Sequence, residues 1–358
     1  MVILHIARLD SFQASGVNVV VPEHVKNQRQ YADAALWNIG EHFEIDGLDQ
    51  NFSADGLDAL PSPYRRPDIA VFHEVYIPKF LSIAKQLRKL GIPYVVVPHS
   101  SLNRAAQKKS RLKKIPANLL FFKPFCEKAG GIQFLSQKEL DDRVFGANPF
   151  IATNGIYPQD EVKTSFGKNG LRFVYIGRLQ PYIKGLDIMI QAFAAQKELL
   201  KANNCTLDIY GPDEDNGMHC APVVRDMIKA AQAEDFITLH PAVFGDDKKS
   251  ALLNSDIFIQ TSRNDGMPMG ILEALSLGLP CLVTDGTTLG ELIEKNGAGW
   301  RAETNAEAVA SALEKAVEER QTLSEKSSGA LRCTESFRWS RAAKTAVDNY
   351  GKICKKEQ

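Results

Sequence analysis

The stretch Ser262–Glu273, SRNDGMPMGILE, decides how this chain of 358 residues is organised. The apolar run Asp256–Gln260 (DIFIQ) precedes it and predicts a buried strand. A helix is expected to begin near Pro268, where the missing N–H of proline is no loss, and to end at Gly278 before Pro280. The loop therefore joins the end of a strand to the positive end of a helix, an arrangement that favours an anionic ligand.

Two carboxylates bracket this predicted anion site. Asp265 lies in the loop, and Glu273 follows eight positions later in the expected helix. At a rise of about 1.5 Å per residue, Glu273 lies roughly 7–8 Å along the helix from Pro268. A second interpretation stays open, in which Asp265 only caps the helix and Glu273 is a solvated helix residue.

The spacing of the two acids, followed by ALSLGLPCLVTD (274–285), resembles the signature of family 4 retaining glycosyltransferases of the GT-B fold. In that family the first acid holds hydroxyl groups of the donor sugar, and the second holds the ribose hydroxyls of the nucleotide. The family usually has Glu at the first position, so Asp265 is one methylene shorter. The resemblance implies that the donor is bound by Asp265, Gly266, Met267, Met269, Gly270 and Glu273.

A second motif carries positive charge. The run 171–177 (LRFVYIG) predicts a strand, and Arg178 and then Lys184-Gly185 follow it before a long amphipathic helix. A departing nucleoside diphosphate accumulates negative charge, which preplaced cations stabilise without reorganisation. The segment resembles the family's GRL…KG pattern, whose Arg and Lys bind the donor diphosphate. Gly16 stands where the family has a glycine pair near the donor phosphates.

The nucleobase site is expected after two further strands, 206–210 and 236–240. In the family the loops after these strands form the base pocket, partly through backbone atoms. The resemblance implies a donor-binding role for Tyr210, Gly211 and Val243.

Metal and redox cofactors are not expected. Asp213-Glu214-Asp215 mimics the DxD metal motif of a different glycosyltransferase architecture, and we interpret it as an exposed acidic loop. No GxGxxG follows a predicted strand, which disfavours an NAD(P) enzyme. The family's mechanism needs neither a metal nor, in the expected form, a protein nucleophile, because the leaving phosphate itself takes the acceptor's proton.

The first half of the chain alternates short apolar runs with helical stretches, a pattern typical of a doubly wound parallel sheet. The predicted strands are 2–6, 43–45, 68–73, 94–98 and 131–135, and the predicted helices are near 78–90, 105–125 and 137–144. With the second unit, this predicts an α/β protein of the GT-B fold, in which two Rossmann-like domains face each other across a cleft.

The domain boundary is expected in the polar, turn-rich segment after Asn154-Gly155, a pair that resembles the family's Asn-Gly before the linker. We predict an N-terminal, acceptor-side domain over 1–160 and a nucleotide-sugar-binding domain over 161–337. Two helices, 305–318 and about 338–352, are expected to close the chain. The segment from about 338 to 358 would complete the N-terminal domain, anchored by Phe337 and Trp339.

Two predicted strands of the first domain end in histidine. His73-Glu74 and His99-Ser100-Ser101 follow strands whose carboxyl ends should face a ligand. A lone histidine is more often structural, but two at equivalent places favour function. PHSSL resembles the family's PHGSL, whose His lies beside the donor sugar, with Ser100 in place of Gly. The resemblance implies a catalytic role for His99, and we expect His73, Glu74, Ser100 and Ser101 on the acceptor side.

A basic and aromatic segment covers residues 104–128. It holds one acid, Glu127, and interleaves apolar residues with eight basic ones: Arg104, Lys108, Lys109, Arg111, Lys113, Lys114, Lys123 and Lys128. A solvated helix face is one interpretation; an anionic membrane surface, which attracts Lys and Arg, is the one we favour. No recognised nucleic-acid motif accompanies these charges, so nucleic acid is not an expected partner.

Composition bounds the cellular context. The formal net charge is zero, and the six cysteines show no CxxC spacing, as in the reduced packing residues of a cytosolic protein. The start, MVILHIARLD, has no basic region typical of a signal peptide, and no apolar run approaches about 20 residues. We expect a cytoplasmic protein, peripheral on the cytoplasmic face of the inner membrane.

Together these features predict a retaining glycosyltransferase. It would move a sugar from a nucleotide diphosphate sugar to a hydroxyl acceptor, expected to be a lipid-linked glycan of surface polysaccharide biosynthesis (lipopolysaccharide or capsule). Two alternatives stay open. One is a nucleotide-sugar epimerase or another GT-B reaction such as a phosphorylase, and the other is a non-catalytic nucleotide-sugar-binding scaffold.

Overall fold

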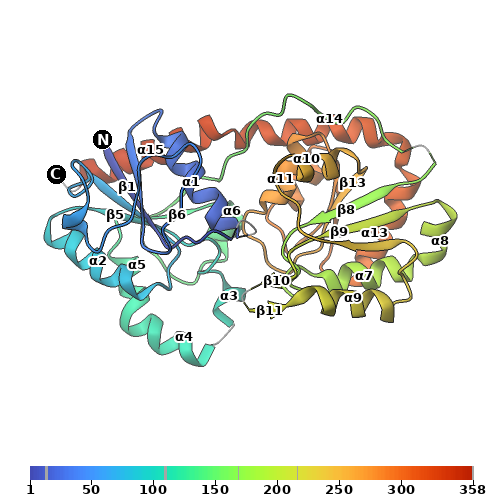
Figure 1. Ribbon diagram of the computed structural model, residues 1–358, viewed down its shortest axis with the longest axis horizontal. Coiled ribbons are helices and arrows are strands. Elements are labelled where there is room, and N and C mark those ends of the chain that lie inside the picture. The colour runs from blue at the N-terminus through green and yellow to red at the C-terminus, as the bar shows by residue number, and fades with distance from the viewer. Residues whose placement is uncertain (13–14, 109–110, 168, 216, 357–358) are drawn as a thin grey trace. The chain divides into compact units, whose positions relative to one another are not determined.

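The chain divides into two compact units, Met1–Gly155 with Trp339–Gln358, and Ile156–Arg338. The computed structural model describes residues 1–358 except 13–14, 109–110, 168, 216 and 357–358 (Figure 1). The first unit is called the N-terminal unit below and the second the C-terminal unit. The division falls after Gly155, a few residues before the predicted boundary at 160.

The N-terminal unit is built on one parallel sheet of seven strands in the order β3-β2-β1-β4-β5-β6-β7. The strands are β1 (Val2–Ala7), β2 (Asp33–Asn38), β3 (Asn51–Phe52), β4 (Ile69–His73), β5 (Tyr94–Val97), β6 (Gly131–Phe134) and β7 (Pro149–Ile151). From β1 the sheet continues through β2 to β3 on one side and through β4, β5 and β6 to β7 on the other, as in a doubly wound fold. The α/β fold class is confirmed.

Four of the five predicted strands of this unit are confirmed as β1, β4, β5 and β6, and the strand predicted at 43–45 is wrong. Residues 43–45 lie in the loop before β3, where the Phe43 carbonyl accepts a hydrogen bond from the Asn51 side chain. The strand beside β1 is instead β2, DAALWN, of which all but the first residue are buried.

Helices cover both faces of this sheet (Figure 1). They are α1 (Gly16–Gln28), α2 (Pro78–Lys89), α3 (Arg104–Lys108), α4 (Arg111–Ala117), η2 (Asn118–Phe122), α5 (Lys123–Glu127), α6 (Gln137–Asp141) and α15 (Trp339–Lys356), with η1 (Leu57–Ala59). The single helix predicted over 105–125 is therefore wrong in detail. The segment forms several short helices, with residues 109–110 outside the described part.

The last helix, α15, packs against α1 within the N-terminal unit. Its Tyr350 hydroxyl donates to Gln133 Oε1 at 2.6 Å, deep inside the unit. At its start, Trp339 packs so closely on Gly155 that a Cβ there would lie 2.3 Å from the indole ring. Phe337, just before the helix, accepts a hydrogen bond at its carbonyl from the Ile156 N–H at 2.7 Å. The glycine of Asn154-Gly155 is thus required by the packing of α15.

The C-terminal unit has a six-stranded parallel sheet in the order β12-β9-β8-β13-β14-β15. The strands are β8 (Arg172–Ile176), β9 (Thr206–Tyr210), β12 (Ile237–His240), β13 (Ile257–Gln260), β14 (Cys281–Thr284) and β15 (Gly299–Ala302). β8 and β13, which precede the two motifs of this unit, are neighbours in the sheet. Their carboxyl ends therefore lie at the same edge.

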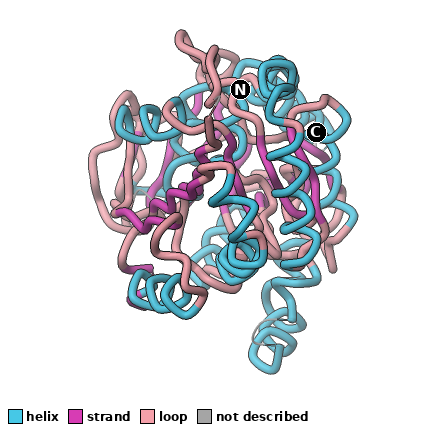
Figure 2. Tube along the Cα trace, turned by 90° about the vertical axis from the view of Figure 1, so that its right-hand side faces the viewer, coloured by secondary structure: helices cyan, strands magenta, loops and turns pink. Residues whose placement is uncertain are grey.

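Helices also cover both faces of this second sheet, with α11 and α14 on one side and α7 and α9 on the other (Figure 1). They are α7 (Leu186–Ala195), α8 (Lys197–Ala202), α9 (Cys220–Ala230), α10 (Gly245–Leu253), α11 (Met269–Ser276), α12 (Gly290–Lys295), α13 (Ala306–Glu318), α14 (Leu323–Thr334), with η3 (Arg320–Thr322) and η4 (Glu335–Phe337). Figure 2 shows strands enclosed by helices from a second direction. The sequence analysis did not predict α14.

The acidic run after β9 forms part of a small hairpin. β10 (Glu214–Asp215) pairs with β11 (Met218–His219), and the exposed Asp213 lies 3.6 Å from His219. Among the described residues, no group of three or more His, Cys, Asp or Glu side chains is placed to hold a metal ion.

The backbone at the end of β5 turns through a left-handed conformation. His99 has φ of 47° and Ser100 has φ of 64°, values that favour glycine. The Ser100 N–H donates to Glu139 Oε1 at 2.6 Å, and the other oxygen of Glu139 accepts from the Leu135 N–H at 2.8 Å. Burial raises the pKa of Glu139. A buried carboxyl group of α6 thus holds the strand end in a strained shape.

The strain at Ser100 gives a testable prediction. We expect Ser100→Gly to raise the free energy of unfolding by about 0.5–1 kcal/mol, because release of left-handed strain exceeds the entropy that glycine adds. Urea denaturation followed by circular dichroism measures this change. Ser101→Gly is the matched control: its φ is negative, so glycine there should destabilise. Destabilisation by both substitutions would show that Ser100 is not strained.

Candidate functional site

The candidate site of the C-terminal unit lies where the loop after β13 enters α11. Pro268 occupies the N-cap position of α11 and makes no side-chain cap hydrogen bond. After α11, Gly278 has φ of 73°, so the predicted start and stop of this helix are confirmed. The alternative in which Asp265 caps the helix is wrong, because Pro268 holds that position.

Asp265 is bonded to residues of two other segments. Its Oδ2 accepts from Lys184 Nζ at 2.5 Å and from Gln260 Nε2 at 2.8 Å, and Gln260 also donates to Ser262 Oγ at 3.1 Å. The side chains of Lys184 and Asp265 are 15% and 14% exposed, so the ion pair is largely shielded from water. The structure therefore joins two residues that are 81 positions apart in the sequence and that belong to different motifs.

Glu273 forms an ion pair with Lys248 of α10. Both side chains are 26% exposed, so Glu273 is not the solvated helix residue of the second interpretation. Lys248 was not predicted from the sequence. The sequence signal for it is the basic pair Lys248-Lys249 on the helix before β13. Lys248 pairs with Glu273 and Lys249 with Glu161, and the sequence does not distinguish the two lysines.

The loop after β8 packs on the loop after β13 without room for a side chain. Gly185 has φ of 67°, and a Cβ there would lie 1.9 Å from the Thr261 carbonyl oxygen. The Thr261 hydroxyl donates to the Gly185 carbonyl at 2.7 Å. The Lys-Gly pair of the motif is thus explained: the glycine allows the contact that brings Lys184 to Asp265.

An arginine that the sequence analysis missed clamps the same two loops. Arg263 makes two parallel hydrogen bonds to Asp187 of α7, at 2.7 and 2.8 Å, and its guanidinium lies 4.2 Å from the centre of the Tyr182 ring. Bidentate pairs of this kind fix orientation as well as distance. The Asp187 partner raises the pKa of Arg263 further, so the guanidinium stays charged.

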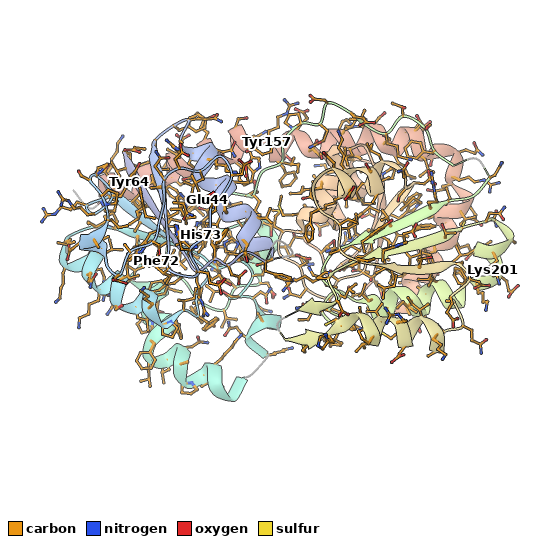
Figure 3. The ribbon with its side chains drawn as sticks, viewed as in Figure 1. Glu44, Tyr64, Phe72, His73, Tyr157 and Lys201 are labelled. Carbon is orange, nitrogen blue, oxygen red and sulfur yellow. The ribbon has the colours of Figure 1, made fainter. Side chains whose placement is uncertain are left out.

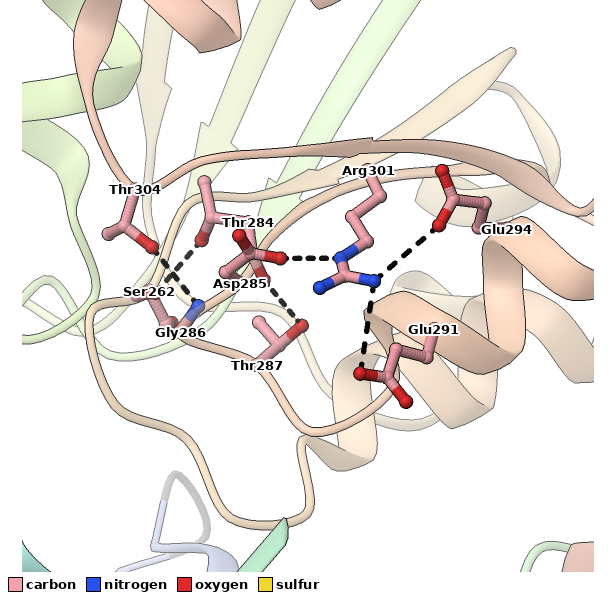
Figure 4. A network of polar contacts seen from close by, with 9 residues as sticks. All are labelled: Ser262, Thr284, Asp285, Gly286, Thr287, Glu291, Glu294, Arg301 and Thr304. Atoms are coloured by element: carbon pink, nitrogen blue, oxygen red, sulfur yellow. Dashed lines mark hydrogen bonds and ion pairs between the residues drawn. The ribbon is translucent and has the colours of Figure 1, made fainter.

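A polar network from β14 and β15 braces the other side of the loop (Figure 4). The Thr284 hydroxyl donates to the Ser262 carbonyl at 2.8 Å, and the Asp265 N–H donates to the Gly286 carbonyl at 2.9 Å. Gly286 is in turn bonded to Thr304 Oγ1 at 3.1 Å. Asp265 is therefore held through its backbone and its side chain, which fixes the direction of its carboxylate.

An arginine outside this loop completes the network. Arg301 of β15 donates to Asp285 at 2.5 Å and lies 3.9 Å from Glu291 and 3.5 Å from Glu294 (Figure 4). The Asp285 partner raises the pKa of Arg301. These groups tie β15 to α12 behind the loop.

The remaining donor residues predicted in the C-terminal unit lie at the same edge of its sheet. Arg178 follows β8, and its carbonyl accepts from the Tyr175 hydroxyl at 2.9 Å. Tyr210 ends β9 and stacks on His240, with ring centres 4.4 Å apart. Gly211 is tightly packed, since a Cβ there would lie 2.5 Å from the Gly177 carbonyl. The others are Val243 in the loop after β12, Gly266 and the buried Met267 in the loop after β13, and Met269 and Gly270 at the start of α11.

The other predicted site residues belong to the N-terminal unit: Gly16, His73, Glu74, His99, Ser100 and Ser101. Gly16 begins α1, whereas His73 and Glu74 lie at the end of β4, and burial raises the pKa of Glu74. The Ser101 hydroxyl donates to the Pro98 carbonyl at 2.7 Å. His73 lies inside the unit (Figure 3).

The two predicted histidines of this unit are in direct contact. His73 Nδ1 lies 3.1 Å from His99 Nε2. A third member, His5 of β1, was not predicted from the sequence; its Nδ1 lies 2.9 Å from His73 Nε2. Burial lowers the pKa of His5 and of His99 to about 3 and that of His73 well below its ordinary value. All of them are neutral at pH 7.

Comparison with known proteins finds that one segment is similar to a described family. Residues 158–330 match the family described as glycosyl transferases group 1. The amylovoran biosynthesis glycosyltransferase AmsK of Erwinia amylovora is 29% identical over 150 residues, which are 40% of this chain and 35% of AmsK. The putative colanic acid biosynthesis glycosyltransferase WcaL of Escherichia coli (strain K12) is 27% identical over 150 residues, with the same coverage. The chain thus covers about a third of the length of these relatives.

Solved structures match almost the entire chain. Sucrose-phosphate synthase from Thermosynechococcus elongatus has a TM-score of 0.77 at 13% identity, with 98% of each chain covered. HepE of Anabaena, in complex with UDP-glucose, has a TM-score of 0.73 at 16% identity and covers 98% of this chain and 100% of its own. WaaG, a glycosyltransferase involved in lipopolysaccharide biosynthesis, has a TM-score of 0.70 at 12% identity, with 98% and 99% covered.

The identities to these structures are low, so they show the fold alone, which is GT-B. The chain has the GT-B fold, and its segment that carries Arg178, Lys184, Asp265 and Glu273 matches glycosyl transferases group 1.

Proposed function

We propose that the protein is a retaining glycosyltransferase of family 4 that moves a sugar from a nucleotide diphosphate sugar to a hydroxyl acceptor. The observation that carries this proposal is the ion pair between Lys184 and Asp265, which unites the diphosphate motif with the acidic motif at one sheet edge. The match of residues 158–330 to glycosyl transferases group 1 supports it.

Each charged group of the site has a proposed role. Arg178 and Lys184 hold the diphosphate and stabilise the negative charge that it gains as the bond to the sugar breaks. Asp265 accepts hydrogen bonds from hydroxyl groups of the sugar, and Glu273 from those of the ribose. Without donor, Lys184 and Lys248 neutralise these carboxylates, so that neither is left as an uncompensated, partly buried charge.

The proton balance requires no further protein group in the central step. The acceptor oxygen attacks the anomeric carbon, the bond to the diphosphate breaks, and the leaving phosphate oxygen takes the acceptor's proton. Because Arg178 and Lys184 supply the positive charge, we propose that turnover needs no metal ion and continues in the presence of EDTA.

The proposed acceptor is a lipid-linked glycan in surface polysaccharide biosynthesis. The relatives carry the names amylovoran biosynthesis glycosyltransferase and putative colanic acid biosynthesis glycosyltransferase, which supports the polysaccharide part. The lipid part rests on an exposed apolar surface of the N-terminal unit, made of Ile115, Leu119, Leu120 and Phe121, which are 51%, 69%, 65% and 52% exposed. The next aromatic residue, Phe122, is buried, so the segment is anchored on one side only.

Basic side chains accompany this apolar surface. Arg104, Lys108, Lys123 and Lys128 are exposed nearby in the sequence, a combination that anionic lipid headgroups attract. None of the described helices is long and apolar enough to cross a membrane. We therefore propose peripheral contact of residues 104–128 with the cytoplasmic face of the inner membrane.

Donor binding is the first prediction of this proposal. In buffer that contains EDTA, one sugar nucleotide from a panel of UDP-, GDP- and ADP-sugars should raise the midpoint temperature of thermal unfolding. Arg178→Ala and Glu273→Ala should each weaken its binding about 10–100-fold, the effect of losing a charge-assisted hydrogen bond. Calorimetric titration of the purified variants measures the affinities.

Arg225→Ala is the matched control for this experiment, because Arg225 is exposed on α9, away from the motifs. It should bind the donor like the unaltered protein. A folded protein that binds none of the sugars would contradict the proposed function, and donor turnover without an acceptor would indicate another GT-B reaction.

Membrane contact is tested with lipid vesicles. We expect the double variant Leu119→Glu with Leu120→Glu to bind anionic phosphatidylglycerol vesicles at least about tenfold more weakly, because two exposed leucines no longer enter the lipid and two charges repel it. Flotation through a density gradient measures the bound fraction. Val223→Glu, on an exposed apolar residue of α9, is the control. Equal binding of all variants would argue that this surface does not face the membrane.

A further inference from the structure

Three buried or part-buried histidines form a continuous hydrogen-bonded chain in the N-terminal unit. His5 Nδ1 lies 2.9 Å from His73 Nε2, and His73 Nδ1 lies 3.1 Å from His99 Nε2. Neighbouring rings are stacked, with centres 5.2 and 5.3 Å apart. The chain crosses three adjacent strands, since β1, β4 and β5 follow one another in the sheet. It ends at His99, just beyond β5.

A chain of neutral imidazoles has a direction. Each neutral ring carries one N–H, which donates, and one bare nitrogen, which accepts. Once one nitrogen of the first ring is assigned, every later ring in the chain is assigned too. The residue at the inner end of the chain therefore decides which nitrogen of His99 carries a proton.

The inner end of the chain is Gln28 of α1. Its Oε1 lies 3.0 Å from His5 Nε2, and its side chain also lies beside the Tyr350 hydroxyl. The proton positions depend on whether the amide oxygen or the amide nitrogen of Gln28 faces His5. The hydrogen bonds around Tyr350 determine this orientation.

The Tyr350 proton is already committed elsewhere. Gln133 Nε2 donates to the Ala152 carbonyl at 3.0 Å, so the oxygen of Gln133 faces Tyr350 and accepts its proton at 2.6 Å. With its proton donated to Gln133, the Tyr350 oxygen can act only as an acceptor, so it favours the NH₂ group of Gln28 on its side over the amide oxygen. Gln28 Nε2 makes no hydrogen bond to a described residue, but an amide oxygen in its place would face the Tyr350 oxygen, which is another acceptor. The Gln28 oxygen consequently faces His5.

The proton positions now follow along the chain. His5 donates from Nε2 to Gln28, which leaves its Nδ1 bare to accept from Nε2–H of His73. The Nδ1 of His73 is then bare and accepts from Nε2–H of His99. Nδ1 of His99 remains as a bare nitrogen, and among the described residues no hydrogen-bond partner faces it.

We propose that Gln28, His5 and His73 are positioning residues that fix His99 as the Nε2–H tautomer, so that His99 Nδ1 accepts a hydrogen bond from a hydroxyl group of the substrate. The hydrogen bond of Ser100 to the buried Glu139 fixes the backbone of His99 at the carboxyl end of β5, the edge where ligands of such sheets bind. The choice of a sugar hydroxyl as ligand rests on the proposed function.

This arrangement selects for one chemical class. A neutral imidazole with a bare nitrogen accepts a proton donor, whereas a keto group, a deoxy position or a phosphate oxygen offers it none. Burial also lowers the pKa of His99, so its imidazole stays neutral and lacks the positive charge that would attract a phosphate. The substrate therefore carries a free hydroxyl at the position that meets His99.

His24 provides an internal contrast. It lies close to the chain, with its ring centre 5.9 Å from that of His73, but its Nε2 bonds to Asn154 Oδ1 at 2.9 Å and its Nδ1 has no partner in the described structure. A change at Asn154 should therefore affect His24 and leave the chain intact.

The test is nuclear magnetic resonance of the whole protein labelled with ¹⁵N-histidine. The variants His5→Gln, His73→Gln and His99→Gln assign the histidine signals. Long-range proton–nitrogen spectra distinguish a bare ring nitrogen from a protonated one. At pH 7 we expect His5, His73 and His99 each to show a protonated Nε2 and a bare Nδ1. A protonated Nδ1 on any of the three, or a mixture of tautomers, would overturn the proposal.

A second variant tests whether Gln28 determines the tautomer of His99. Gln28→Met removes the hydrogen-bond acceptor at the inner end of the histidine chain, with His5 and His73 between it and His99. This variant should convert His99 to a mixture of tautomers, whereas Asn154→Leu should leave the tautomer of His99 unchanged. An unchanged His99 in folded Gln28→Met would overturn the relay. These spectra need no donor, so a relay confirmed in a protein that binds no nucleotide sugar would reject only the proposed function.

Discussion

The ion pair of Lys184 and Asp265 is the interaction on which the C-terminal unit's site depends. It joins the loops after β8 and β13, neighbouring strands of one sheet. A largely buried charge that loses its partner is destabilising, so each loop restricts where the other can lie. The glycine contact at Gly185 and the clamp of Arg263 on Asp187 hold the two loops at the separation that the pair requires.

Much of this site could be predicted from sequence because the geometry of parallel sheets is simple. An apolar strand followed by a glycine-bearing loop and a helix predicts where Arg178, Lys184, Asp265 and Glu273 stand. Strands of a doubly wound sheet then bring their carboxyl ends to one edge. The partners Lys248 and Arg263 could not be predicted, because which lysine or arginine reaches a carboxylate depends on how helices pack, and no local pattern records it.

The failed predictions in the fold have the same origin. The sequence of β2, DAALWN, is rich in residues that also suit a helix, and only its burial between β1 and β3 makes it a strand. Residues 43–45 have strand-like composition but lie in the loop before β3, and it is β3 that pairs with β2. His5 was invisible as a site residue because it lies inside a buried strand, 68 positions from the histidine it contacts.

The central claim is that Lys184 and Asp265 recognise different parts of one nucleotide sugar, and paired titrations test it most directly. Lys184→Met and Asp265→Asn would be titrated with the nucleotide sugar that the protein prefers and with its nucleoside diphosphate alone. We predict that Lys184→Met weakens the binding of both ligands, whereas Asp265→Asn weakens only the binding of the nucleotide sugar. Equal weakening of both ligands by Asp265→Asn, or no effect of Lys184→Met, would contradict it.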